Sequence, residues 1–235
     1  MIEITDLYKR FGKVKVLDGV SLEINGGGVF AVLGPNGSGK TTLIKSILGM
    51  VIPQAGAIHV NEQHVKGQWQ YREDINYLPQ IARFPENLSV KELIGMIKNL
   101  RGKKANDDAL IELFGLEEFM DKKLGNLSGG TKQKVNLVLT FMFDCPLLIL
   151  DEPTTGLDPV SLIHLKELIQ KEKEAGKTIL ITTHIMDFVD SMADEIVFLL
   201  EGNIYFKGTV AELKKKSSKN ELEHAIATIL TEQND

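Results

Sequence analysis

One glycine-rich stretch, Gly34–Thr41, has the residue types and the spacing that bind the phosphates of a nucleotide. Its sequence, GPNGSGKT, fits the pattern G-x-x-x-x-G-K-[ST], whose glycines let the backbone curl around phosphate oxygens without a Cβ in the way. In this pattern the lysine reaches the β- and γ-phosphates, and the last hydroxyl is a ligand of Mg²⁺. We therefore expect a bound nucleoside triphosphate. The expected nucleotide-binding residues are Gly34, Pro35, Asn36, Gly37, Ser38, Gly39, Lys40, Thr41 and Thr42.

An acidic pair, Asp151 and Glu152, follows the apolar run 147–150. Ligands of open parallel sheets gather at the carboxyl ends of the strands, where this pair would lie. Taken alone, such a pair is as consistent with a solvated turn as with a metal site. The phosphate loop upstream favours the second interpretation, in which Asp151 holds Mg²⁺ and Glu152 polarises an attacking water.

A second glycine-containing stretch, Leu127–Gln133, has the sequence LSGGTKQ. Its serine is a good helix N-cap, and the two glycines that follow would leave the first N–H groups of the helix open to an anion. A plain helix start has the same residue types. The chemistry alone leaves both interpretations open.

Strands and helices must position these residues. The apolar run 29–33 predicts a buried strand before the phosphate loop, and apolar residues at helical spacing predict a helix after it. The second half of the chain alternates strands with helices, as parallel sheets do. It predicts strands over 147–151, 178–182 and 195–200, helices over 160–175 and 185–192, a hairpin at 202–206 and closing helices over 209–232.

The first half has a different pattern. Alternation of apolar and polar residues over 2–4 and 14–24 predicts antiparallel strands. Residues 53–56 predict a turn that leads into a strand at 57–60. A further strand from Ile75 is expected to stop at Pro79.

Residues 85–145 predict helices without strands. Ser89 and Glu92 have the spacing of a capping box, and an apolar face follows at Leu93, Ile94, Ile97 and Leu100. The expected fold class is therefore α/β. It comprises a P-loop NTPase core with a mostly parallel sheet, an antiparallel β subdomain at the N-terminal side and an inserted α-helical subdomain.

Composition excludes several classes of protein. The formal net charge of −5 argues against a nucleic-acid partner, because such proteins normally carry a basic surplus. A single cysteine, Cys145, excludes an internal disulfide and fits a reducing cytosol. No apolar run approaches the roughly 20 residues that span a bilayer, so we expect another chain to provide any membrane anchor.

Taken together, these motifs resemble those of ATP-binding-cassette (ABC) ATPases. The stretch LSGGTKQ resembles the LSGGQ signature, with Thr131 in place of the usual glutamine. Gln80 is similar to the Q-loop glutamine, Gly156–Asp158 to the D-loop, and His184 to the switch histidine. The resemblance spans about residues 1 to 215. It implies one ABC ATPase domain over 1–235, with a RecA-like core and antiparallel strands in 1–84 and 146–215, a helical subdomain in 85–145 and a C-terminal helix in 216–235.

Two departures from the commonest signature bear on the subgroup. Thr131 and Lys134 stand where glutamine and arginine are usual. They favour a subgroup closer to exporters and ABC-2-type systems than to nutrient importers. The phosphate contact of the family is made by the serine and glycines, which are present.

The resemblance also implies roles for individual residues. Phe11 would stack on adenine, although an aromatic residue in a strand is also explained by packing. Thr41, Gln80 and Asp151 would hold Mg²⁺. Three residues are implied in catalysis: Glu152 would orient the water, and His184 and Lys40 would stabilise charge.

Other implied roles concern a second subunit. Ser128, Gly129 and Gly130 would complete the ATP site of the partner, and Asp158 would act in the D-loop. Asp158 precedes Pro159, so a purely local role as a helix N-cap is a further interpretation. ATP would close a dimer of two ABC ATPase subunits, expected to be copies of one chain, and hydrolysis would open it.

The family further implies a separate transmembrane permease, which would hold the protein at the cytoplasmic, inner face of the membrane. A short permease helix would dock beside Gln80, where Phe84, Pro85 and Leu88 either line the groove or belong to the helical core. One alternative is a soluble ABC ATPase for cofactor assembly, such as iron–sulfur assembly. Another is a binding-only cassette, which the intact Lys40 and Glu152 argue against.

Overall fold

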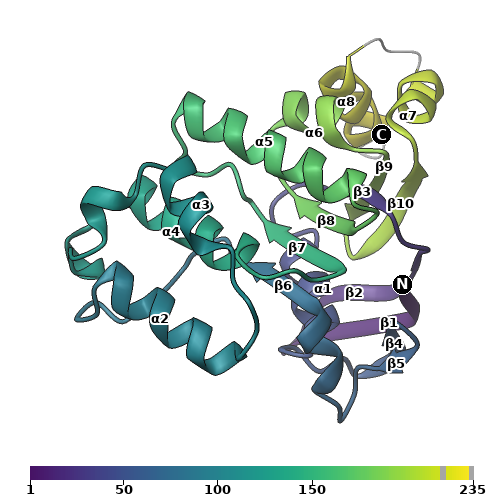
Figure 1. The fold of residues 1–235 in the computed structure, drawn as a ribbon. Helices are drawn as coiled ribbons and strands as arrows, with labels where there is room; N and C mark the ends of the chain where they lie inside the picture. Colours follow the sequence, from purple (N-terminus) through teal and green to yellow (C-terminus); the bar gives the residue numbers. More distant parts are fainter. Residues whose placement is uncertain (218–220, 233–235) are drawn as a thin grey trace.

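The computed structural model describes residues 1–217 and 221–232, and two sheets organise them (Figure 1). The larger sheet has six strands in the order β10-β9-β3-β8-β7-β6, of which only β10 runs antiparallel to its neighbour. Its parallel strands therefore share one carboxyl edge. Its strands are β3 (Gly28–Leu33), β6 (Ile75–Leu78), β7 (Leu147–Asp151), β8 (Thr178–Thr182), β9 (Glu195–Leu200) and β10 (Asn203–Gly208).

The central strands of this sheet are buried on both faces, as their apolar runs predict. Alternate residues enter different clusters. In β7, Leu147 and Ile149 pack with the antiparallel strands and α1 (Lys40–Ile47), whereas Leu148 and Leu150 pack with the helices of the opposite face. The sheet therefore lies between two apolar layers, one on each face. Packing on both faces fixes the position of its carboxyl edge.

The smaller sheet is antiparallel, with the order β2-β1-β4-β5, and confirms the predicted N-terminal strands. The expected turn over 53–56 is wrong at its end, because Ala55 and Gly56 already belong to β4. Gly56 has a φ of 90°, and a Cβ there would lie 2.4 Å from Asp6 O on β1. Its lack of a side chain lets two strands approach closely, which single-sequence turn patterns do not reveal. The strands are β1 (Ile2–Phe11), β2 (Val14–Ile24), β4 (Ala55–Val60) and β5 (Gln63–His64).

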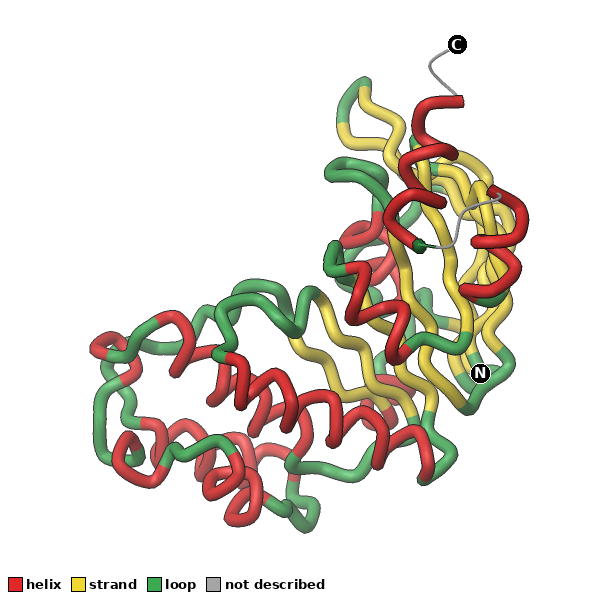
Figure 2. Tube along the Cα trace, turned by 90° about the horizontal axis from the view of Figure 1, so that it is seen from above, coloured by secondary structure: helices red, strands yellow, loops and turns green. Residues whose placement is uncertain are grey.

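Residues 85–145 contain helices and no strand, and they lie at one end of the molecule, away from the N-terminus (Figures 1 and 2). The capping box of Ser89 and Glu92 is present at the start of α2. Leu100 is a correction, because it is 75% exposed; the buried residues of α2 all lie in its first half. The α-helices of this segment are α2 (Val90–Arg101), α3 (Asp107–Leu113) and α4 (Gly129–Phe141), and the short 3-10 helices Glu117–Phe119 and Leu124–Asn126 lie between α3 and α4.

The remaining α-helices are α5 (Pro159–Glu174), α6 (Met186–Met192), α7 (Val210–Ser217) and α8 (Leu222–Glu232), and a short 3-10 helix, Gln70–Asp74, precedes β6. The expected boundary between residues 215 and 216 falls inside α7, so it does not separate two elements. Residues 218–220 and 233–235 of the expected C-terminal helix lie outside the described residues. The proposed division into subdomains stays a prediction.

Close contacts support the phosphate loop from outside. The N–H of Gly202, in the β9–β10 turn, donates to Ser38 O at 3.3 Å, and Gly202 O accepts from Asp18 N at 3.0 Å. Gly202 has a φ of 78°, and a Cβ there would lie 2.7 Å from Val16 O. The turn therefore joins the phosphate loop to β2 only if this position has no side chain.

We predict that Gly202→Ala lowers the free energy of unfolding by about 2–3 kcal/mol. The added methyl group would be disfavoured by the left-handed backbone conformation and by the close contact with Val16 O. Gly67→Ala is the matched control, since its φ is 80° and nothing lies within 4 Å of a built Cβ. We expect it to cost only the backbone term of about 1 kcal/mol. Urea unfolding measures both, and equal losses would contradict the contact with Val16.

Candidate functional site

The phosphate loop connects β3 to α1 at the carboxyl edge of the larger sheet (Figure 1). Gly34, Gly37 and Gly39 all have positive φ, and a Cβ on Gly34 would lie 2.1 Å from Leu199 O. Gly39 is the N-cap of α1 and supplies no side-chain acceptor. The first N–H groups of the helix are therefore free for an anion.

A cavity of about 360 Å³ opens beside this loop. Its wall includes Phe11 from β1, Gln80 after β6, and Asp151 and Glu152 from the end of β7. The fold thus brings together residues that are far apart in the sequence. The phosphate-loop side of the wall consists of Asn36, Gly37, Gly39, Lys40, Thr41 and Thr42.

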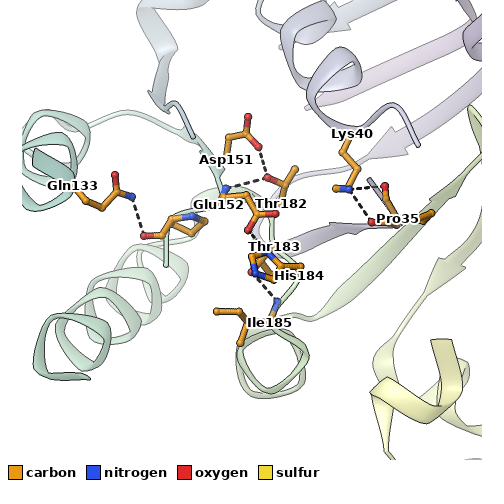
Figure 3. Close-up of polar contacts among 11 residues, drawn as sticks. Pro35, Lys40, Gln133, Asp151, Glu152, Thr182, Thr183, His184 and Ile185 are labelled. Carbon is orange, nitrogen blue, oxygen red and sulfur yellow. Dashed lines mark hydrogen bonds and ion pairs between the residues drawn. The ribbon is translucent and has the colours of Figure 1, made fainter. Parts of the chain in front are cut away.

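Three of the expected nucleotide-binding residues do not line this cavity. Gly34 and Pro35 instead accept hydrogen bonds from Lys40 Nζ, at 2.8 and 3.0 Å (Figure 3). Ser38 is buried, and its hydroxyl has no partner among the described residues. Burial lowers the pKa of Lys40 below its usual value, while the nearby carboxylates of Glu152 and Asp151 act in the opposite direction.

The acidic pair lies beside Thr182, the last residue of β8 (Figure 3). Asp151 is only 2% exposed and accepts a hydrogen bond from Thr182 Oγ1. The same hydroxyl accepts from Glu152 N at 3.1 Å, and Thr182 O accepts from that N–H at 3.0 Å. One threonine therefore orients both acidic residues.

Glu152 has a φ of 52°, in the left-handed region that residues other than glycine rarely adopt. Pro153 follows it and adds its own restriction to the preceding backbone. Such conformations persist where surrounding contacts hold them, and they cluster at functional sites. Glu152 Oε2 lies 2.9 Å from His184 Nδ1, so the histidine contacts the acidic residue although it does not line the cavity.

The stretch 128–130 lies at the start of α4 and does not line the cavity of its own chain. Ser128 is the N-cap and accepts from Thr131 N at 3.2 Å; Ser128 and Gly129 are exposed. Asp158 is the N-cap of α5, and it also forms an ion pair with Lys134 of α4 at 2.8 Å. The hydrogen bonds from Lys134 and Ser161 lower the pKa of Asp158.

Sequence reasoning missed two side chains that hold the acidic loop. One is Thr182, and the other is Gln133, whose Nε2 donates to Pro153 O at 3.1 Å (Figure 3). The sequence contains a signal for Thr182. It is the polar last residue of a predicted parallel strand, and such a residue lies next to the polar residues at the end of the neighbouring strand. In this sheet Asp151 and Thr182 are direct partners across β7 and β8.

The donor set fits Mg²⁺ in the presence of a nucleotide. Thr41, Gln80 and Asp151 bring three kinds of oxygen to one cavity wall. Within residues 1–217 and 221–232, no group of three or more His, Cys, Asp and Glu side chains could hold a metal ion. A site with one carboxylate suits a hard cation that takes its other ligands from phosphate and water.

No helix among the described residues is both long and apolar enough to cross a membrane.

Comparison with known proteins gives consistent results. The family described as ABC transporter matches residues 17–155. The bacitracin transport ATP-binding protein BcrA of Bacillus licheniformis is 32% identical over 223 residues, which cover 93% of this chain and 73% of that protein. The daunorubicin/doxorubicin resistance ATP-binding protein DrrA of Streptomyces peucetius is 34% identical over 227 residues, covering 94% and 69%.

Solved structures agree in fold. An ATP-binding subunit of an ABC transporter superposes with a TM-score of 0.90 at 30% identity, over 97% of this chain and 98% of that one. A dimeric ATP-binding cassette in a post-hydrolysis state, bound to ADP and Pi, gives a TM-score of 0.79 at 22% identity, over 89% and 98%. The second likeness shows the fold alone.

We predict that Thr182→Val lowers the free energy of unfolding by about 1–3 kcal/mol, because buried partners lose the hydroxyl. It should also lower kcat for ATP hydrolysis on the order of tenfold, through misplacement of the acidic pair. Thr178→Val is the matched control: Thr178 is fully buried in the same strand, and its hydroxyl accepts from Gly27 N at 2.9 Å. An equal loss of kcat in both variants would contradict a role for Thr182 in the site.

Proposed function

The chain belongs to the ABC transporter family of ATP-binding proteins, and from that premise we propose that it is the ATPase subunit that drives a separate membrane permease. The observation that carries the proposal is the single cavity that joins the phosphate loop to Gln80 and the acidic pair. It supports hydrolysis as well as binding of ATP. The orphan N–H groups at the start of α1 favour the phosphates, and Phe11 lies on the cavity wall where it can stack on the base.

Each catalytic residue has a distinct task. Glu152 polarises the attacking water, and its carboxylate is held by His184 at 2.9 Å. A carboxylate only accepts hydrogen bonds, so His184 Nδ1–H donates to Glu152. The other ring nitrogen is left to interact with the γ-phosphate or its water. Lys40 exchanges its carbonyl partners for phosphate oxygens. Mg²⁺ bound by Thr41, Gln80 and Asp151 would neutralise charge on the phosphates.

Two copies of the chain form the working unit. Ser128, Gly129 and Gly130 lie outside their own cavity, and two of them are exposed. A helix N-terminus with free N–H groups can cover the open face of a γ-phosphate held by another phosphate loop. We therefore assign these three residues to the ATP site of the partner copy, and Asp158 to the D-loop. ATP closes this dimer, and hydrolysis opens it.

The permease docks at the junction of the large sheet and the helical segment. Ile81, next to Gln80, is 71% exposed and offers an apolar contact. Phe84 and Leu88 are partly buried against the helical core, and Phe84 also lines a cavity of about 320 Å³ beside it. The permease keeps the protein at the inner face of the membrane. BcrA and DrrA are named for bacitracin transport and daunorubicin/doxorubicin resistance. We therefore propose that the permease belongs to an ABC-2-type exporter.

A mixing experiment tests both the ATPase activity and the composite sites. We predict that wild type hydrolyses ATP, and that Lys40→Ala and Ser128→Arg are each inactive alone. The first variant lacks the lysine that binds phosphates, and the second places a bulky side chain over the partner's nucleotide. An equimolar mixture should regain up to about a quarter of the wild-type rate, because half of randomly paired dimers hold one intact site.

The controls decide the interpretation. Each variant must keep the melting temperature of the wild type within experimental error. Activity that stays absent in the mixture, with wild type active, would contradict composite sites. A wild-type chain that binds but does not hydrolyse ATP would contradict the proposed function itself.

A further inference from the structure

Two buried amide side chains on α4 reach the two loops that carry the site. Gln133 is 7% exposed, and its Nε2 donates to Pro153 O at 3.1 Å (Figure 3). Asn136 is 4% exposed, and its Nδ2 donates to Pro79 O at 3.2 Å. The two residues are three positions apart and therefore lie on one face of the helix.

The acceptors of these bonds flank the residues that act on the nucleotide. Pro153 directly follows Glu152, and Pro79 directly precedes Gln80. One rigid helix thus holds both the loop of the water-polarising carboxylate and the loop of the glutamine. The bond from Gln133 to Pro153 O is buried, so loss of its donor would leave that carbonyl without a partner at the full desolvation cost.

The bond from Gln133 has a particular importance for Glu152. The backbone of Glu152 is left-handed, with a φ of 52°, and so needs contacts on both sides to persist. Thr182 supplies the contacts to Glu152 N. Gln133 supplies the contact that follows the residue, at Pro153 O.

The first turns of α4 carry further contacts to the loop after Glu152. A Cβ on Gly130 would lie 2.8 Å from Gly156 O, so helix and loop touch there. Lys134 pairs with Asp158 at 2.8 Å. These contacts connect the exposed start of α4, where Ser128 lies, to the loop that follows Glu152.

We propose that Gln133 and Asn136 are positioning residues through which α4 sets the placement of Glu152 and Gln80 in its own ATP site. This inference rests on the proposed function and deepens it, because the start of the same helix is assigned to the ATP of the partner copy. When the ATP of the partner copy binds against Ser128, α4 thereby changes the placement of the Glu152 carboxylate in this chain's own ATP site. Gln133 is the principal link, since Glu152 has the strained backbone.

The test replaces each amide by a side chain of similar size that cannot donate. Gln133→Met should lower kcat by about ten- to a hundredfold, the scale expected from small misplacements of a catalytic group, with the Kd for ATP unchanged. Because hydrolysis opens the dimer, the dimer formed with Mg²⁺-ATP should last longer than that of the wild type, as light scattering would record. A residue needed only for folding would weaken the dimer, so the sign of this change is diagnostic.

Asn136→Leu should raise the Mg²⁺ concentration at which the ATP-dependent dimer forms, because Gln80 is a proposed ligand of that ion. Thr140→Val is the matched control for both variants. Thr140 is 3% exposed on the same helix, and its hydroxyl donates to Asn136 O at 2.8 Å without reaching either loop. We expect it to keep kcat, Kd and dimer lifetime near those of the wild type.

Wild-type activity tests the proposed function, and the two amide variants test the positioning role. If wild type hydrolyses ATP and both amide variants behave like Thr140→Val, the positioning role is wrong while the proposed function stands. If wild type does not hydrolyse ATP, the function itself is contradicted. Should Gln133→Met fail to fold, Gln133→Leu is measured in the same way.

Discussion

The hydrogen bonds of the Thr182 hydroxyl are the interaction on which the site depends. This one group joins Asp151 and the N–H of Glu152, both of which are nearly removed from solvent. Buried carboxylates and amides are costly unless they are paired. The parallel register of β7 and β8 places Thr182 directly beside Asp151, and a slip of one residue would turn its side chain to the other face.

Because both faces of the sheet are buried, the register between β7 and β8 is strongly specified. Alternate residues of β7 enter two separate apolar clusters, so a shifted strand would misplace every side chain. The phosphate loop benefits from the same order, because the turn around Gly202 connects it to β2 through backbone contacts. The rigid edge therefore fixes the phosphate loop and the acidic pair relative to each other.

Much of this could be predicted from the sequence, because its signals are local. The phosphate loop, the buried strands and the capping box at Ser89 each depend on residues a few positions apart. The start of β4 and the exposure of Leu100 depend on what the rest of the chain packs against them, and here the sequence misled. Gln133 and its acceptor Pro153 are 20 positions apart in the sequence, so no local pattern could predict their contact.

In the proposed cycle, two copies of this chain close around ATP, and Glu152 is needed to open them. The most direct measurement is size-exclusion chromatography with light scattering of Glu152→Gln, with Mg²⁺-ATP and without nucleotide. We predict a dimer with Mg²⁺-ATP and a monomer without nucleotide, together with loss of ATP hydrolysis. A monomer that binds ATP in both conditions, or hydrolysis at the wild-type rate, would contradict it.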